Sequence, residues 1–251
     1  MVTLTASPGE PDAGGGVERV NKRNKPVTIG ISVDLDARGS SAEARYFIGL
    51  NYVEALSQAG VASVLLPSEI GNLSAYLDLC DGFLVPGSNP GEMGALRRQE
   101  FDQALISAAL NEGQPILGIC YGMQMIGLTL GAELHDCPSG ADAIEHDPLA
   151  IPDQAAHDIF LEPSSLLAQV AGGSQKPMPV NSHHRQMLMR HRAFDVSATS
   201  EDGAIEAIEV PGRPFAVGVQ WHPEYRLTKF DCAIFSAFIG ACQSPSPRYL
   251  S

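Results

Sequence analysis

An apolar run that ends in a cysteine between two glycines is the feature of this sequence that most constrains its fold. Residues 115–119 have the length and composition of a buried strand, and residues 123–130 show helical spacing of apolar side chains. Cys120 stands between them, with Gly118 and Gly122 at its second neighbours. A tight strand-to-helix turn crowds the backbone at its tip and therefore needs small flanking residues. The pattern predicts a nucleophile elbow, with a buried structural cysteine in a glycine-rich turn as the alternative.

A second apolar run supplies the groups that a thiol nucleophile needs. The elbow would hold the Cys120 sulfur at a helix N-terminus, where free N–H groups and the helix dipole favour the thiolate. Such a nucleophile also needs a base, and the base needs a third group that fixes its tautomer. Residues 215–220 form a strand-like run that leads to His222, and Glu224 follows two residues later. Together these side chains predict a Cys–His–Glu catalytic triad.

Apolar runs of strand length alternate with segments of helical spacing along the first half of the chain. Strands are expected over residues 27–35, 61–66, 81–86 and 115–119, and helices over residues 44–59 and 95–111. Later runs at 157–161, 194–199, 204–210 and 215–220 are short and separated by turns, which favours antiparallel strands, and 229–242 has helical spacing. The predicted fold class is α/β, a single-domain flavodoxin-like sandwich. It has a mostly parallel central sheet with helices on both faces and a small antiparallel sheet.

Length, charge and cysteine content limit the classes of function. The chain has 251 residues, 44% of them hydrophobic, which suits one domain over residues 27–243, between a disordered tail at 1–26 and a C-terminal tail at 244–251. A net charge of −13 argues against nucleic acid or an anionic membrane as partner. No apolar stretch reaches transmembrane length. Five cysteines without a C-x-x-C pair suit a reducing, cytoplasmic location.

Two motifs, GICYGMQ at 118–124 and QWHPE at 220–224, resemble those of the class I glutamine amidotransferase superfamily. Within it the chain is most similar to the free-standing γ-glutamyl-γ-aminobutyrate hydrolases of the C26 peptidase group. Three further segments carry that similarity: NYVEALSQAGVASVLLP at 51–67, GFLVPG at 82–87 and VNSHHRQ at 180–186. The resemblance implies that Cys120, His222 and Glu224 are catalytic.

Other positions are expected to bind the substrate or to stabilise the oxyanion. A tetrahedral intermediate needs two preorganised donors, which the N–H of Tyr121 and an N–H of Gly87 or Ser88 would supply, although residues 86–90 could also be an ordinary turn. The resemblance makes Gln124 a binder of the glutamyl backbone end, with an exposed polar group of the helix as the alternative.

A polar cluster follows the strand-like residues 178–180. We expect Ser182, His183 and His184 to form a wall of the site, with structural histidines as the alternative. Adjacent histidines project differently, and no carboxylate or cysteine completes a ligand set here, so no metal site is expected. The remaining histidines are assigned no role; they are His135, His146, His157 and His191.

The activity expected is hydrolysis of γ-glutamyl amides through a thioester on Cys120, with no cofactor or metal, and with a small γ-glutamyl compound as the substrate. The sequence leaves room for a homo-oligomer. Tyr121 stands where these hydrolases often have arginine, and the loop after Pro90 is short, so the amine half of the substrate stays open. The same CYGMQ stretch resembles the glutaminase part of GMP synthetase. A glutaminase subunit that feeds ammonia to a synthetase, or a catalytically silent binding module, are therefore the alternatives.

Overall fold

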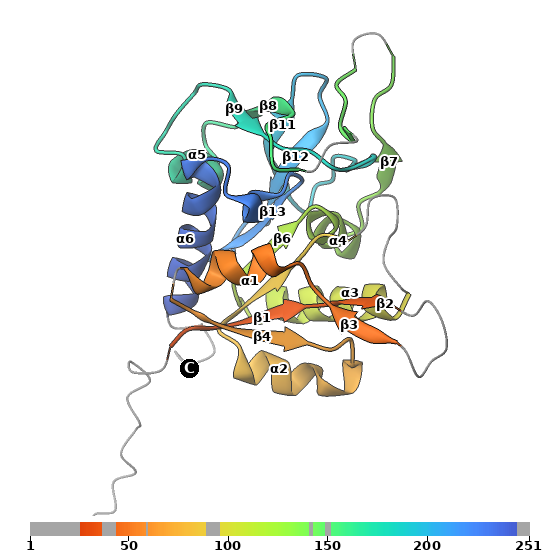
Figure 1. Cartoon of the computed structure of the whole chain (residues 1–251), viewed down its shortest axis with the longest axis vertical. Coiled ribbons are helices and arrows are strands. Elements are labelled where there is room, and N and C mark those ends of the chain that lie inside the picture. The colour runs from red at the N-terminus through yellow and green to blue at the C-terminus, as the bar shows by residue number, and fades with distance from the viewer. Residues whose placement is uncertain are drawn as a thin grey trace, which may run out of the picture.

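The central feature of the fold is one nine-stranded sheet (Figure 1), in the order β4-β1-β5-β6-β13-β12-β11-β8-β9. The computed structural model describes residues 26–36, 44–58, 60–88, 96–140, 143–148 and 152–244. The tails expected at 1–26 and 244–251 lie almost wholly outside these residues.

One half of the sheet is parallel and the other is antiparallel. The parallel strands are β4 (Ala62–Leu66), β1 (Thr28–Ser32), β5 (Gly82–Val85), β6 (Ile116–Ile119) and β13 (Ala216–Val219). The antiparallel strands are β12 (Ile205–Glu209), β11 (Asp195–Ser200), β8 (His157–Leu161) and β9 (Met178–Val180). The predicted α/β class and single domain are confirmed. The later strands extend the central sheet instead of forming a separate one, because β12 pairs directly with β13.

Two short antiparallel ribbons accompany the large sheet. They are β2 (Asp34–Asp36) with β3 (Arg45–Phe47), and β7 (Leu134–Asp136) with β10 (Gln186–Leu188). The first ribbon corrects the helix expected over 44–59, since α1 begins only at Leu50. Residues 45–47 instead pair in register with β2, and Gly49 has an extended backbone at the N-cap of the helix.

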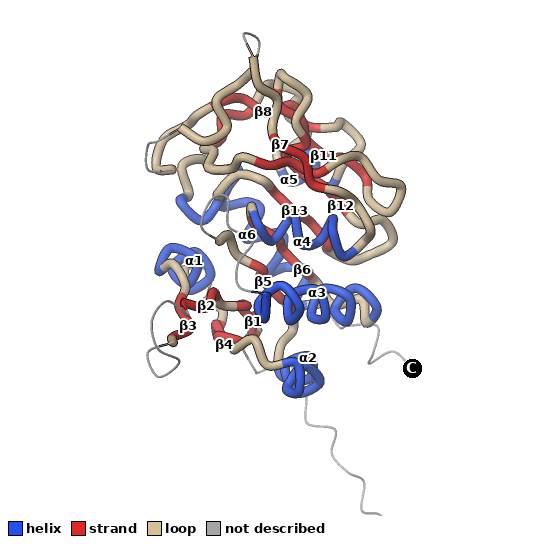
Figure 2. The backbone as a smooth tube through the Cα atoms, turned by 90° about the vertical axis from the view of Figure 1, so that its right-hand side faces the viewer, coloured by secondary structure: helices blue, strands red, loops and turns tan. Residues whose placement is uncertain are grey.

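Helices cover both faces of the sheet (Figure 2). On one face lie α1 (Leu50–Ser57), α5 (Leu166–Val170) and α6 (Lys229–Gln243); on the other lie α2 (Leu73–Leu79), α3 (Leu96–Asn111) and α4 (Tyr121–Thr129). Two short 3₁₀ helices span Ile70–Asn72 and Pro223–Tyr225. No helix within the described ranges is long and apolar enough to cross a bilayer.

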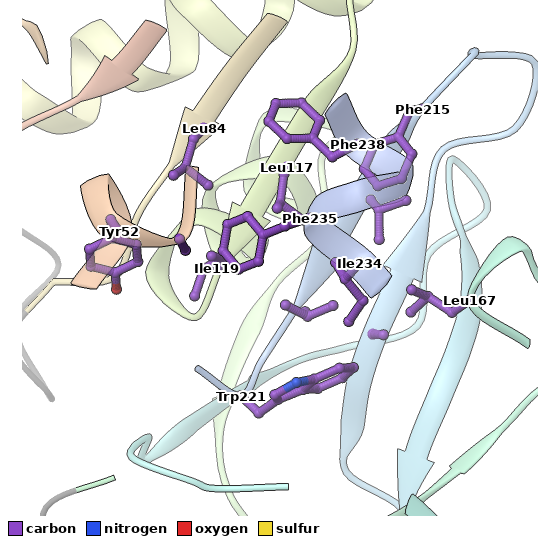
Figure 3. Packing of buried hydrophobic residues seen from close by; sticks show 14 of the residues in the cluster. Tyr52, Leu84, Leu117, Ile119, Leu167, Phe215, Trp221, Ile234, Phe235 and Phe238 are labelled. Carbon is purple, nitrogen blue, oxygen red and sulfur yellow. The ribbon is translucent and has the colours of Figure 1, made fainter. Parts of the chain in front are cut away.

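Successive side chains along the central strands point to opposite faces of the sheet and fill a hydrophobic core on each face. In β5, Leu84 packs into the core under α1 and α6, while Phe83 and Val85 pack into the core under α3 and α4. Figure 3 shows the first core, where the aromatic rings of Trp221 and Phe238 lie among aliphatic side chains. The motif-bearing strands β6 and β13 are therefore buried on both sides, and their carboxyl ends form the rigid edge on which the site is built.

Candidate active site

The chain turns sharply at Cys120, between the end of β6 and the start of α4. The residue has φ 52° and ψ −106°, a backbone conformation that non-glycine residues rarely adopt and that costs free energy. A Cβ on Gly122 would collide with the carbonyl oxygen of Val85, and a Cβ on Gly118 would come within 2.6 Å of the Gly122 carbonyl. Both glycines are thus required by close backbone packing, as expected for a nucleophile elbow.

The Cys120 sulfur is nearly buried and has two polar neighbours. The Gln220 side chain donates to Sγ from Nε2 at 3.5 Å, and Sγ lies 3.9 Å from the carbonyl oxygen of His183. A further polar group is the first N–H of α4, that of Tyr121, which cannot have an acceptor inside its own helix.

His222 follows β13 and faces the elbow with Glu224 behind it. Nδ1 of His222 lies 2.7 Å from Oε1 of Glu224, and both side chains are buried. Burial alone would lower the pKa of His222, but the charge of Glu224 and the Cys120 thiol outweigh it and hold this pKa well above 6.5. Nε2 has no hydrogen-bond partner among the described residues. The structure therefore brings the three predicted triad residues together, with one nitrogen of the base committed to Glu224 and the other available.

Asn181 fixes the backbone of His222, a role that the sequence did not indicate. Its Oδ1 accepts from the N–H of His222 at 2.8 Å, and its Nδ2 donates to the carbonyl oxygen of His222 at 3.0 Å. This side chain is buried. The only sequence signal for Asn181 is its place in the VNSHHRQ segment at 180–186, where the sequence predicts roles for Ser182 and the two histidines.

The turn after β5 lies against the triad. A Cβ on Gly87 would approach Cε1 of His222 to 3.0 Å and Cβ of Cys120 to 3.7 Å, so the glycine backbone borders both side chains. Its N–H donates to the hydroxyl oxygen of Tyr52 at 3.1 Å. Burial and the charge of Glu224 raise the pKa of Tyr52 well above 10.0. Tyr52 is a further residue of the site that the sequence did not single out, because α1 brings it there from a distant segment.

A buried arginine binds the backbone of this turn. Arg98 is fully buried, pairs with Asp34 at 3.1 Å and with Asp102 at 3.2 Å, and donates to the carbonyl oxygen of Pro86 at 2.9 Å. The Ser88 hydroxyl donates to the same Asp34 at 2.8 Å. The side chain of Ser88 is therefore held by Asp34. The turn at residues 86–88 is fixed by Arg98 and Asp34 as well as by its connection to the sheet.

The predicted substrate-binding residues separate into two groups. His183 is only half-buried and its ring centroid lies 6.4 Å from that of His222, so it borders the site. Burial lowers the pKa of His183 below 6.5 despite the neighbouring Asp147. Gln124 is buried, and its Nε2 donates to the Gln186 carbonyl oxygen at 3.0 Å and to Gln220 Oε1 at 3.3 Å.

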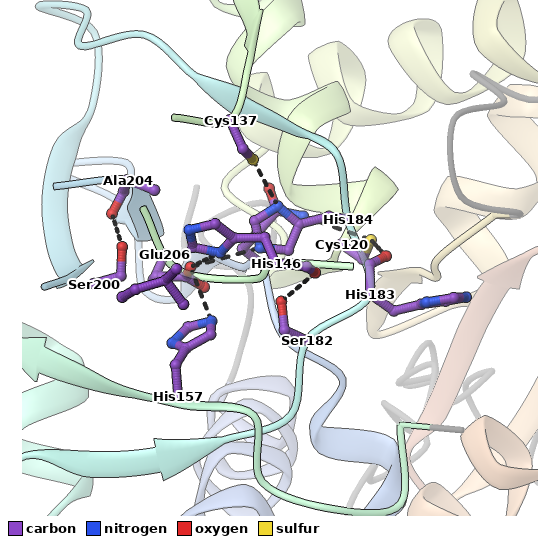
Figure 4. A network of polar contacts seen from close by, with 12 residues as sticks. Cys120, Cys137, His146, His157, Ser182, His183, His184, Ser200, Ala204 and Glu206 are labelled. Carbon is purple, nitrogen blue, oxygen red and sulfur yellow. Dashed lines mark hydrogen bonds and ion pairs between the residues drawn. The ribbon is translucent and has the colours of Figure 1, made fainter. Parts of the chain in front are cut away.

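Ser182 and His184 turn away from the sulfur. The Ser182 hydroxyl donates to the carbonyl oxygen of His146 at 2.6 Å, and the His184 ring is buried beside His146 and Glu206. Figure 4 shows His183 and His184 pointing to opposite sides of the segment that carries them. Both side chains pack inward, so the structure does not place these two residues in the wall of the site.

Known proteins match this chain over most of its length. The family model of Peptidase C26 matches residues 26–224. The γ-glutamyl-γ-aminobutyrate hydrolase of Escherichia coli O157:H7 is 30% identical over 247 residues, which cover 89% of this chain and 96% of that protein.

Two solved structures share the fold at low sequence identity. The glutaminase domain of CTPS from Trypanosoma brucei, with bound acivicin, matches with a TM-score of 0.60 and 19% identity over 86% of this chain and 93% of that one. A glutamine amido transferase from Methylobacillus flagellatus matches with a TM-score of 0.59 and 15% identity over 86% and 95% of the two chains. The family match and the 30% identity over most of both chains show that the chain belongs to the Peptidase C26 family of glutamine amidotransferase-like hydrolases.

Proposed function

We propose that this protein hydrolyses the γ-glutamyl amide bond of small γ-glutamyl amines or amino acids and releases glutamate. The observation that carries the proposal is the arrangement at the elbow, where Cys120 stands on a strained turn beside a buried histidine that Glu224 orients at 2.7 Å. The similarity to a γ-glutamyl-γ-aminobutyrate hydrolase over most of both chains supports the substrate class. The amine that leaves is γ-aminobutyrate, another amino acid or a polyamine derivative.

In the proposed mechanism His222 takes the proton of Cys120 through Nε2. The sulfur attacks the γ-carbonyl carbon, and a tetrahedral intermediate forms whose oxygen carries the negative charge. His222 then protonates the leaving amine, and a γ-glutamyl thioester stays on Cys120. Water that His222 deprotonates attacks the thioester, the C–S bond breaks, and glutamate leaves. Glu224 stabilises the imidazolium that forms in both halves of the reaction.

The proposed donors to the oxyanion are the N–H groups of Tyr121 and Gly87. The first opens a helix and has no acceptor within it, which suits a preorganised donor. The second now binds the Tyr52 hydroxyl oxygen at 3.1 Å, in the way it would bind the oxyanion, so Tyr52 must move aside when substrate enters. His183 is proposed to bound the substrate from the opposite side, and Gln124 stays a candidate for the glutamyl backbone end.

A glutaminase subunit of a synthetase is the second candidate, because solved glutaminase and amidotransferase structures share this fold. The free-standing hydrolase is favoured because the 30% identity extends over 96% of a γ-glutamyl-γ-aminobutyrate hydrolase. No cofactor is part of the proposed reaction, and a cytoplasmic location suits its free thiol.

The test compares two substrates with the purified protein alone, without ATP or another protein. Glutamate release is measured from γ-glutamyl-γ-aminobutyrate and from free glutamine at matched concentration, with the Cys120→Ala variant as the blank. We expect the γ-glutamyl amide of the amino acid to be cleaved faster. Cleavage of glutamine alone, or no reaction until a synthetase is added, would replace the hydrolase with the glutaminase subunit.

A further inference from the structure

Three histidines and one glutamate converge beneath the wall of the active site. They are His146, His157, His184 and Glu206, and one ligand atom from each lies within 4.8 Å of the others. Figure 4 shows the three rings arranged around the Glu206 carboxylate. The Glu206 side chain is fully buried, and the three histidine side chains are 2–4% exposed. The triad does not use this cluster.

Each histidine has an inner ring nitrogen that faces Glu206 and an outer ring nitrogen that faces away from it. The outer nitrogen lies close to a hydrogen-bond acceptor. Nε2 of His146 lies 3.1 Å from Oδ2 of Asp202, Nδ1 of His184 lies 3.1 Å from the carbonyl oxygen of Gln186, and Nδ1 of His157 lies 3.2 Å from the carbonyl oxygen of Asp158. Carbonyl and carboxylate oxygens only accept, which places the proton of each neutral ring on the outer nitrogen. At His184 the Cys137 sulfur also lies 3.4 Å from Nδ1, and its role there follows the tautomer that the Gln186 carbonyl sets. The inner nitrogens are left with lone pairs that face one another.

The inner atoms have no hydrogen-bond partner within the described part of the chain. This holds for Nδ1 of His146, Nε2 of His157, Nε2 of His184 and both oxygens of Glu206. Buried acceptors that face one another repel unless a cation or added protons lie between them. Outward hydrogen bonds from ligating histidines to carboxylate or carbonyl groups are also the usual outer shell of a metal site.

The distances from Glu206 to the three histidines match a tetrahedral ion better than direct hydrogen-bonded ion pairs, and the four ligand atoms as a set lie within 4.8 Å of one another. Oε1 of Glu206 lies 3.4 Å from the His146 nitrogen, 3.5 Å from that of His157 and 3.5 Å from that of His184. A charge-assisted N–H···O bond is shorter, about 2.7–2.9 Å. With metal–ligand bonds of about 2.0–2.1 Å, the ligand-to-ligand edge of a tetrahedron is about 3.3 Å.

We propose that His146, His157, His184 and Glu206 bind one divalent transition metal ion, with Zn²⁺ the best fit, in a closed structural site. Three imidazoles and one carboxylate are ligands of the type that zinc takes in proteins, and four protein ligands complete its tetrahedron. The site has no open position for water or substrate, so its role is structural rather than catalytic.

The ion would join four separate segments behind the wall of the active site. The carbonyl oxygen of His146 accepts from the Ser182 hydroxyl at 2.6 Å and from the His184 N–H at 2.9 Å. The neighbouring His183 carbonyl lies beside the Cys120 sulfur. Glu206 is tied to the site as well, because its carbonyl oxygen accepts from the N–H of Gln220 at 2.7 Å. The metal would therefore hold the segment that borders the nucleophile.

Metal binding is tested on the full chain without a polyhistidine tag. The protein is stripped with a chelator, titrated with Co²⁺ and then with Zn²⁺, and bound metal is measured by elemental analysis after gel filtration. The ligand variants are Glu206→Gln and His157→Gln. Matched controls are His135→Gln, which removes a half-exposed histidine outside the cluster, and Cys120→Ala, which removes the reactive thiol.

We expect about one zinc ion per chain in the natural sequence and in both controls, and at least tenfold weaker binding in the two ligand variants. The Co²⁺ form should show the intense visible absorption of a four-coordinate ion, without a sulfur-to-metal charge-transfer band, and zinc should raise the melting temperature. Should Glu206→Gln fail to fold, the Co²⁺ spectrum and His157→Gln decide the question. Retention of less than about a tenth of an ion per chain, equal loss in the controls, or a sulfur charge-transfer band would overturn the proposal and leave protonated histidines around Glu206.

Discussion

At the scale of single residues, Cys120 combines a strained backbone with a polar surrounding. Its φ of 52° turns the side chain out of the sheet, and the close packing of two glycines maintains that conformation. Strain of this kind persists only where the surrounding structure enforces it. Cys120 is thus positioned by the backbone, while His222 beside it is positioned by the side chains of Glu224 and Asn181.

Cys120→Ala should abolish activity and leave the fold intact. The change removes the sulfur but keeps the Cβ, so little packing is lost, and we expect glutamate release from a γ-glutamyl amide to fall by roughly a thousandfold or more. Cys232→Ala, which alters an exposed cysteine of α6, is the control. Activity above a tenth of that of the natural sequence, with an unchanged melting curve, would rule out Cys120 as the nucleophile.

The pair of His222 and Glu224 should make stability depend on pH. Burial lowers the pKa of His222 in the folded protein, but the charge of Glu224 outweighs it and the net pKa is raised. The pair therefore contributes its full stabilisation of the folded state at pH values below the pKa of an unfolded histidine. That contribution is lost as pH rises through the folded-state pKa. We expect Glu224→Gln to lower the free energy of unfolding in urea by about 3 kcal/mol near pH 6, and by less near pH 9.

Glu100→Gln, an exposed change on α3, provides the control for this pH series. Its difference from the natural sequence should be small at both pH values. A destabilisation by Glu224→Gln that grew with pH would mean that the His222 pKa is not raised in the folded protein.

At the scale of elements, the contact between α4 and the neighbouring strands leaves no room at the elbow. Gly122→Ala places a methyl group against the Val85 carbonyl, a backbone group that cannot rotate away, and should destabilise by about 3 kcal/mol or more. Gly240→Ala is the matched control, since a Cβ there meets nothing within 4 Å and alanine favours a helix by up to about 1 kcal/mol. Equal urea midpoints for the two variants would show that the elbow is not closely packed.

The elements that the sequence predicted well are those with a strong local pattern. The residues of β6, β8 and α6 were anticipated within one or two positions, because apolar runs and helical spacing set them. The short strand β3 was mistaken for the first turn of a helix, since its three residues are exposed and only pairing with β2 defines it. Short ribbons of this kind depend on tertiary pairing, which no local pattern reveals.

At the scale of the whole molecule, the residues of the site also divide into those that a local sequence pattern indicates and those that only the fold brings together. The sequence predicts Cys120, His222 and Glu224 as a triad because each stands at or just after the end of an apolar strand. Tyr52 and Asn181 reach the site only through the packing of α1 and of the segment after β9.

The buried histidine cluster was missed for the same reason. In the sequence His184 stands beside His183, whereas its partners in space are residues 146, 157 and 206. Ligands that are far apart in the chain and lack regular spacing leave no motif, so only the fold reveals that they meet.

The most direct test of the proposed chemistry measures how the γ-glutamyl thioester on Cys120 divides between attack by water and attack by hydroxylamine. If a γ-glutamyl thioester forms on Cys120, hydroxylamine will intercept it and yield γ-glutamyl hydroxamate beside glutamate. Two γ-glutamyl amides with different leaving amines are hydrolysed at one hydroxylamine concentration, and both products are measured. The account predicts the same ratio of hydroxamate to glutamate from both substrates, and neither product with Cys120→Ala. Glutamate release without hydroxamate, or a ratio that changes with the leaving amine, would contradict a common thioester intermediate.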